Sequence, residues 1–123
     1  MKLVVLDLGL AVCKLESDNQ FEGVLNSDFF AITKTNDELS LVCKEADIPN
    51  GCIVEKGWSV IKVQGPLDFS LTGILSSLAS PLADAGISIF AISTYDTDYL
   101  LVKTSNLDKA ISVLEGDGHE IVR

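Results

Sequence analysis

The chain has 123 residues, of which 47% are hydrophobic, enough to pack the interior of one ordinary domain or of two very small ones. Eighteen acidic and nine basic residues give a net charge of -9, which would repel nucleic acids and anionic lipid surfaces. The unbroken apolar runs are far shorter than the roughly 18 residues that cross a bilayer, and the first residues do not resemble a signal peptide. We therefore expect a cytoplasmic protein without a nucleic-acid or membrane partner.

The first half of the chain predicts short strands and little helix. Leu3–Leu8 and Ile53–Glu55 have strand character, and Ala11–Leu15 adds a further strand before a polar loop. Residues 10–28 lack the 3.6-residue periodicity of an amphipathic helix, and residues 47–51 are too few for one and contain a proline and a glycine. The first helix of this half is therefore shortened or replaced.

Three cysteines also lie in this half. Cys13, Cys43 and Cys52 are odd in number and have no CxxC spacing, so neither a disulfide framework nor a zinc site is indicated. We expect most of them to be small buried hydrophobic residues, and we expect no metal and no cofactor.

The second half begins with a strand and a helix. Trp58–Val63 is rich in β-branched residues and is closed by a Gly-Pro pair. One buried helix face is then predicted, with a stop at Gly86 and a kink or a restart at Pro81, since proline inside a helix costs up to ~3 kcal/mol. The apolar positions of that face are Leu71, Ile74, Leu75, Leu78, Ala79 and Leu82.

The rest of the second half completes a recognisable order of elements. Ile87–Ser93 and Tyr99–Thr104 read as two strands, Asn106 can cap a helix that contains Leu107 and Leu114, and His119–Val122 reads as a last strand. The order β-α-β-β-α-β is that of the ferredoxin-like α+β fold, an antiparallel sheet with helices on one face. Four strands and two helices are expected.

An internal repeat links the two halves. Shifting the chain by 60 residues superimposes FFAITKTNDELSLVCK on IFAISTYDTDYLLVKT, with identities such as Phe30 with Phe90 and Leu41 with Leu101. We interpret the chain as two units, a degenerate one at 1–56 and a complete one at 57–123, without a linker long enough to make them independent.

These stretches resemble a known family. TKTNDELSLVC, GPLDFSLTGIL and ISTYDTDYLLV are similar to small bacterial proteins with tandem ACT domains, and the same ACT subfamily supplies the modules of the cytosolic arginine sensors of animals, the CASTOR proteins. The resemblance implies tandem ferredoxin-like ACT units, the N-terminal one degenerate, that bind amino acids or similar metabolites and regulate another protein.

The resemblance also implies a place for the ligand. ACT units bind it against the loop after the first strand, here 65–69, and against the loop after the first helix. In the arginine sensors a Gly-Ile pair and the following hairpin also contribute. The implied ligand-binding residues are Leu67, Asp68, Gly86, Ile87, Thr94, Tyr95 and Asp98.

Physical chemistry gives both a case for a pocket and plainer alternatives. The start of the helix near Asp68 could receive a carboxylate, and Asp96 or Asp98 an ammonium group. Asp96 is better explained as a turn residue, Asp68 as a helix cap, and Tyr95 as a cover over a hydrophobic edge. Asp98 is evenly balanced, because it begins an apolar strand.

No enzymatic motif is present. His119 is the single histidine, and the sequence lacks the signatures of serine hydrolases, P-loop proteins and zinc proteases. We expect a non-catalytic sensor or regulatory protein that binds a small molecule. The alternative is an adaptor that acts through oligomerisation without a ligand; a third possibility, regulation of an aspartate-kinase-like enzyme in trans, rests on analogy. Both faces of Ile87–Ser93 are apolar, so we expect the second face to be covered by the other half of the chain or by a second subunit. Sheets that continue edge to edge, or a homodimer, are expected.

Overall fold

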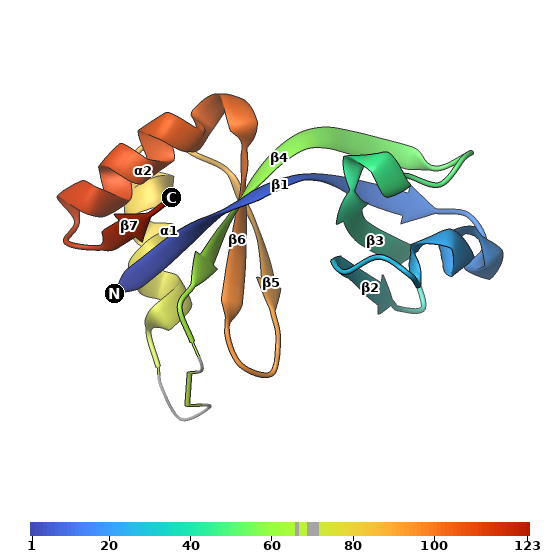
Figure 1. Cartoon of the computed structure of the whole chain (residues 1–123), viewed down its shortest axis with the longest axis horizontal. Helices are drawn as coiled ribbons and strands as arrows, with labels where there is room; N and C mark the ends of the chain where they lie inside the picture. The colour runs from blue at the N-terminus through green and yellow to red at the C-terminus, as the bar shows by residue number, and fades with distance from the viewer. Residues whose placement is uncertain (66, 69–71) are drawn as a thin grey trace. The chain divides into compact units, whose positions relative to one another are not determined.

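The computed structural model describes residues 1–65, 67–68 and 72–123 (Figure 1). Contacts divide the chain into two compact units, a larger one formed by Met1–Asp7 with Ser59–Arg123 and a smaller one formed by Leu8–Trp58. The elements of the described residues are β1 (Lys2–Leu15), the 3-10 helix η1 (Asp18–Val24), β2 (Phe30–Lys34), β3 (Leu39–Lys44), the 3-10 helix η2 (Glu45–Asp47), β4 (Ile53–Val63), α1 (Ile74–Asp84), β5 (Ile89–Ser93), β6 (Asp98–Lys103), the 3-10 helix η3 (Thr104–Asn106), α2 (Leu107–Gly116) and β7 (Glu120–Val122).

The larger unit has the predicted ferredoxin-like order β4-α1-β5-β6-α2-β7, which confirms the α+β fold. Its sheet has one strand more than predicted. The strand order is β7-β1-β4-β6-β5, because the beginning of β1 lies between β4 and β7. Lys2–Val4 pairs with Glu120–Val122 in parallel, whereas β5 and β6 pair antiparallel. The expected four-stranded antiparallel sheet is therefore a five-stranded sheet in which β1 and β7 pair in parallel.

The core of the larger unit joins its two helices to one face of the sheet. Leu78 and Leu82 of α1 and Ala110 and Leu114 of α2 have no exposed surface. They pack with residues that alternate along the strands, as a half-buried sheet requires. The strand residues of this core are Leu3, Ile61, Val63, Leu100 and Val102.

Helix α1 runs without interruption through Pro81, so the expected restart of the helix is wrong. Proline has no N–H to give to the carbonyl four residues earlier, which is that of Ser77. The Nε2 atom of His119 lies 3.3 Å from this carbonyl oxygen. A carbonyl can only accept, so Nε2 must carry the proton. The histidine thus supplies the hydrogen bond that the proline removes.

The end of α1 is a Schellman motif. Gly86 has φ of +75°, its N–H donates to the Ala83 carbonyl (3.0 Å), and the N–H of Ile87 donates to the Leu82 carbonyl (2.9 Å). The predicted stop at Gly86 is confirmed. Leu71, which the periodicity assigned to the start of this helix, lies outside the described residues, and the described helix begins at Ile74.

The smaller unit has the strand order β2-β3-β1-β4, which is the order of a ferredoxin-like sheet. Between its strands, η1 and η2 stand where the fold normally has α-helices. Two strand predictions were wrong here. β1 is one strand of 14 residues and not two, and β4 is one strand through Gly57 (φ +83°), where we expected separate strands at Ile53–Glu55 and Trp58–Val63. β1 and β4 each contribute residues to both compact units, and the larger unit is formed by two segments of the chain. The division into repeats at 1–56 and 57–123 stays a prediction.

The predicted 60-residue repeat is out of register by one position. In β2–β3 the N–H of Thr35 donates to the Glu38 carbonyl (2.9 Å), and in β5–β6 the N–H of Thr94 donates to the Thr97 carbonyl (2.8 Å). The two turns therefore correspond at an offset of 59 residues, from Thr35 to Thr94.

The buried positions have the same offset. The buried run Leu41–Cys43 of β3 falls on the buried run Leu100–Val102 of β6. At an offset of 60, Phe30 and Phe90 are paired, but a shift of one residue along a strand exchanges its two faces. The identities are thus not between equivalent positions, and the matching turn geometry and buried positions are the better evidence for a repeat.

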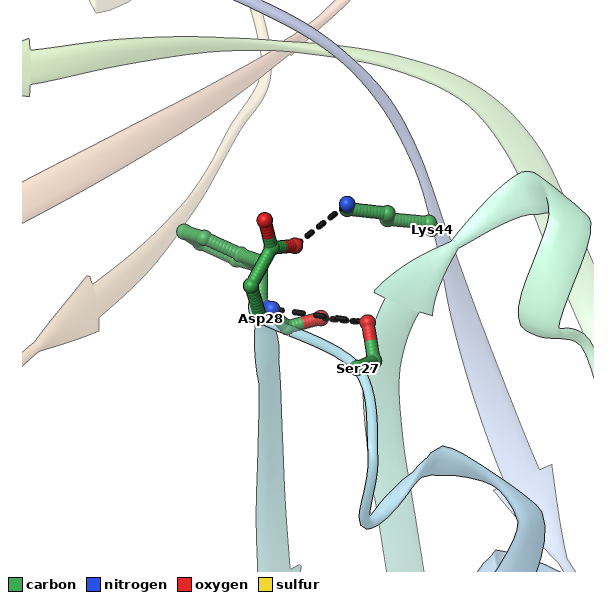
Figure 2. Close-up of polar contacts among 4 residues, drawn as sticks. Ser27, Asp28 and Lys44 are labelled. Carbon is green, nitrogen blue, oxygen red and sulfur yellow. Dashed lines mark hydrogen bonds and ion pairs between the residues drawn. The ribbon is translucent and has the colours of Figure 1, made fainter.

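An ion pair joins the start of β2 to the end of β3 (Figure 2). The Lys44 ammonium bonds the Asp28 carboxylate, and this bond holds the pKa of Asp28 below its ordinary value. The Ser27 hydroxyl lies 3.4 Å from both the N–H and the carbonyl oxygen of Phe29, so the chain is also turned locally before β2.

The three cysteines carry free thiols in the core of the smaller unit. Cys13 and Cys43 are buried, as predicted, and Cys52 is half-buried. Burial raises the pKa of Cys13 to about 12 and also raises that of Cys43, because a thiolate is poorly solvated there. These two thiols are therefore protonated packing groups.

Candidate functional site

A pocket of about 350 Å³ lies within the larger unit. Three segments form its walls. They are the segment after β4, the first turn of α1, and the β5–β6 hairpin. The lining residues are Leu67, Asp68, Gly73, Ile74, Leu75 and the continuous stretch from Ser93 to Asp98.

The hairpin wall is a tight turn held by its own hydrogen bonds. Ser93 and Asp98 are the last paired residues, and the Ser93 hydroxyl donates to the Asp98 carboxylate at 2.5 Å. The Thr94 hydroxyl donates to the Thr97 carbonyl (3.1 Å) and accepts from the Thr97 N–H (3.3 Å). Tyr95, at the tip, is 80% exposed. The Asp98 side chain is thus held by a short bond at the edge of the pocket.

A second set of contacts joins the hairpin to the segment after β4. The buried Thr97 hydroxyl donates to the carbonyl of Val63, the last residue of β4, at 2.6 Å, and the Leu67 N–H donates to the Asp96 carbonyl at 2.6 Å. A Cβ at Gly65 would lie 3.0 Å from the Asp96 carbonyl oxygen and 3.1 Å from the Thr97 Cβ. The two walls are therefore in direct contact at the base of the pocket.

The third wall is the N-terminus of α1. Its N-cap is Gly73, with φ of +75°, and no side chain among the described residues caps this end. The first N–H groups of a helix have no partner within the helix and carry the positive end of its dipole. In this structure that end borders the pocket, because Gly73, Ile74 and Leu75 line it.

The structure brings five of the seven predicted site residues together. Leu67, Asp68, Thr94, Tyr95 and Asp98 all line the pocket.

The other two predicted residues, Gly86 and Ile87, are not in that lining. Gly86 is exposed in the cap of α1, and Ile87 is 4% exposed in the core. They come after the far end of an 11-residue helix, which spans about 16 Å. Phe69, which the expected loop also included, lies outside the described residues.

The pocket carries only negative formal charge. Asp68, Asp96 and Asp98 line it, and no lysine, arginine or histidine does so among the described residues. The four undescribed residues of the neighbouring segment, at positions 66 and 69–71, are uncharged in the sequence. Three carboxylates beside a helix N-terminus can hold a ligand that has both a cationic and an anionic group.

The smaller unit has a hollow of about 270 Å³ at the corresponding place, between the end of β1, η1 and the β2–β3 hairpin. Side chains of this unit bind the polar groups that line the hollow. The Lys34 ammonium pairs with Asp18 at 3.1 Å, and the Gln20 amide oxygen accepts from the N–H groups of Glu16 (2.6 Å) and Ser17 (3.0 Å). The N–H groups of Glu16 and Ser17 at this strand-to-helix turn are thus already satisfied.

Two other kinds of feature are absent from the described residues. They contain no group of three or more histidine, cysteine, aspartate or glutamate side chains placed to hold a metal ion. None of their helices is long and apolar enough to cross a membrane.

Two family models match the sequence of this chain. The ACT domain family model matches residues 53–116, which is more than half of the chain. The chain belongs to the ACT domain family. A separate model, described as an N-terminal domain, matches residues 9–51.

The relatives named for arginine sensing are similar over part of their length. The cytosolic arginine sensor for mTORC1 subunit 1 of Bos taurus is 30% identical over 97 residues, and the human one is 39% identical over 59 residues. These matches take in 70% and 47% of this ACT chain but only 30% and 18% of the two sensors. The chain therefore spans less than a third of each of these relatives.

Solved structures have the same fold over nearly the whole chain. A protein of Agrobacterium tumefaciens is 40% identical, with a TM-score of 0.89, and the match covers 98% of this chain and 91% of that one. The regulatory subunit of aspartate kinase from Thermus thermophilus is 8% identical, with a TM-score of 0.69, covering 94% and 96%. The second likeness shows the fold alone.

Proposed function

We propose that this ACT protein is a non-catalytic regulatory protein that binds a free amino acid in the pocket of the larger unit. The observation that carries the proposal is the meeting of a helix N-terminus and three aspartates in one hollow. The carboxylate of an amino acid would accept from the first N–H groups of α1, and its ammonium group would face Asp98. A volume of about 350 Å³ is within the range of small-molecule sites.

Among amino acids, those with a basic side chain suit this pocket best. One ammonium group can satisfy one aspartate, and a second cationic group would be attracted by the other two, whereas an acidic side chain would be repelled. The bovine and human relatives carry the name of an arginine sensor, which supports the same class. We also propose a cytosolic location, because the names of the same relatives describe cytosolic proteins.

Thermal shift with a panel of amino acids tests the proposal. A ligand at about 100 times its dissociation constant adds about 2.7 kcal/mol to the free energy of unfolding, so a true ligand raises the melting temperature clearly. We expect the basic amino acids to give the largest shifts, and aspartate and glutamate none. If no amino acid shifts the transition at millimolar concentration, the adaptor without a ligand becomes the better description.

The Asp98→Asn variant locates the site. It keeps the size of the side chain and removes its charge, and losing a charge-assisted bond of about 1.5–3 kcal/mol weakens binding about tenfold to a hundredfold. Asp37→Asn is the control, because it removes a carboxylate from the β2–β3 hairpin, which belongs to the smaller unit. The site is misassigned if Asp98→Asn binds as tightly as the wild type, or if Asp37→Asn weakens binding equally.

A homodimer is part of the same proposal. β5 is the last strand of the order β7-β1-β4-β6-β5, and Ile89–Ser93 contains no charged residue, whereas edge strands usually carry charges that prevent pairing. Phe90 and Ile92 remain half-buried. Ile92→Lys should therefore convert a dimer to a monomer in light scattering, whereas Lys34→Ile on β2 should not. A wild type that is monomeric at all concentrations contradicts this.

A further inference from the structure

The base of the pocket is built from a buried hydroxyl that the turn itself does not need. The turn from Thr94 to Thr97 is closed by the bonds of Thr94, which would remain if residue 97 had no hydroxyl. The Thr97 side chain instead donates to the Val63 carbonyl, 34 positions earlier. Thr97 is one of the two buried polar side chains found in the described part of the chain, at 5% exposure.

Two further contacts act at the same junction. The Asp96 carbonyl accepts from the Leu67 N–H at 2.6 Å, so the backbone of the turn is bonded to the wall that carries Leu67 and Asp68. Gly65 leaves the room that this approach requires, because any side chain would press on the Asp96 carbonyl oxygen at 3.0 Å. That oxygen is a backbone atom, which cannot move aside as the end of a flexible side chain can.

We propose that Thr97 is a positioning residue for the ligand pocket: with Gly65 it locks the β5–β6 hairpin to the segment after β4, so that Asp98 and the wall at Leu67 face each other before a ligand arrives. The inference rests on the proposed function. Its physical basis is preorganisation, because a protein whose binding-competent form is only partly populated loses apparent affinity in proportion to that fraction.

Replacement of Thr97 by valine is the direct test. Valine keeps the shape of threonine and removes the donor to Val63, so the two walls separate part of the time. We expect the dissociation constant for arginine, measured by calorimetry, to rise on the order of tenfold, as it would if about a tenth of the molecules kept the competent form. Thr97→Ser retains the hydroxyl and should restore most of the affinity.

A matched control removes a buried hydroxyl elsewhere in the same unit. Ser59 is 8% exposed, and its hydroxyl is 2.9 Å from that of Thr104, outside the pocket lining. Ser59→Ala should lower stability without changing the dissociation constant. An equal loss of affinity in Ser59→Ala and Thr97→Val would mean that general destabilisation, and not positioning, is the cause, and would overturn the proposal.

Hydrogen exchange of the Leu67 amide gives a readout that needs no ligand. This N–H is bonded to the Asp96 carbonyl, so its exchange should be faster in Thr97→Val. It should also be faster in Gly65→Ala, because the added Cβ presses on the Asp96 carbonyl oxygen. The alanine variant replaces the valine variant in this test if the valine variant does not fold. If the wild type binds arginine and neither variant changes affinity or exchange, the positioning role is wrong and the proposed function stands. If the wild type binds no amino acid, the proposed function fails and the inference with it, even where the exchange rates show that the junction is real.

Discussion

The bond between His119 and the carbonyl freed by Pro81 predicts an energetic coupling between two residues 38 positions apart. The perturbation is His119→Phe, which keeps an aromatic ring and removes the Nε2–H that lies 3.3 Å from the Ser77 carbonyl oxygen. The imidazole is 8% exposed, so water cannot readily replace the lost donor. Leaving a buried acceptor without its donor costs about 1–3 kcal/mol, and the length of this bond argues for the lower part of that range.

A double-mutant cycle separates this bond from the packing of the ring. In Pro81→Ala the new N–H of residue 81 can donate to the Ser77 carbonyl, as in any α-helix, so the histidine is no longer needed there. We expect His119→Phe to cost about 1 kcal/mol less in the Pro81→Ala background than in the wild type. Urea denaturation of the four proteins, analysed as two-state unfolding, measures this coupling.

The result that would refute the reasoning is additivity. Independent sites add within about 0.3–0.5 kcal/mol, so a coupling inside that limit would mean that the histidine does not compensate for the proline. Ser80→Ala is the control background, because it changes the residue next to Pro81 without adding a donor for the Ser77 carbonyl. His119→Phe should cost the same in Ser80→Ala as in the wild type.

Other contacts in the two units give three more predictions. The Lys44 ammonium lowers the pKa of Asp28 in the folded protein. The bond therefore stabilises the fold at pH values above the unfolded pKa of 3.8, and this stabilisation is lost as the pH falls through the lower folded pKa. NMR titration should show the Asp28 pKa returning to its ordinary value in Lys44→Met. Gly86→Ala should destabilise by about 1 kcal/mol because φ is +75°, whereas Gly116→Ala within α2 should be neutral or stabilising; a thermal melt in which both behave alike contradicts this. Calorimetry should give one ligand per chain, and a value of two would mean that the hollow beside Lys34 also binds.

The second half of the fold was predictable because its signals are local. The 3.6-residue spacing from Ile74 to Leu82 and the glycine that ends the helix lie within one segment. The first half was less predictable, because the insertion of Lys2–Val4 beside Glu120–Val122 joins the two ends of the chain. No local pattern indicates such a pairing. β4 was predicted as two separate strands, Ile53–Glu55 and Trp58–Val63, but it is one strand.

Some residues of the candidate site could also be predicted from the sequence, and others could not. Thr94 and Asp98 were implied by the family resemblance, and Asp98 was also suggested by its place at the start of an apolar strand. Thr97 could not be predicted, since a threonine in a turn is explained by the turn, and its partner at Val63 is brought near only by the sheet. Gly86 and Ile87 came from the family resemblance, and in this chain they lie beyond the opposite end of α1 from the pocket.

The two hairpins explain why the strand pattern alone does not specify a pocket. Both units contain a hairpin closed by the same turn, from Thr35 to Glu38 and from Thr94 to Thr97. The units differ in the segment between the first strand and the first helix. In the smaller unit a short 3-10 helix begins almost at once, and Gln20 binds the N–H groups that precede it. In the larger unit, residues 64–73 separate β4 from α1, and the helix end meets the pocket uncapped by any described side chain. Among the described residues, the two units therefore differ beside the hairpin: a side chain binds backbone N–H groups in the smaller unit, and none caps the helix end in the larger unit.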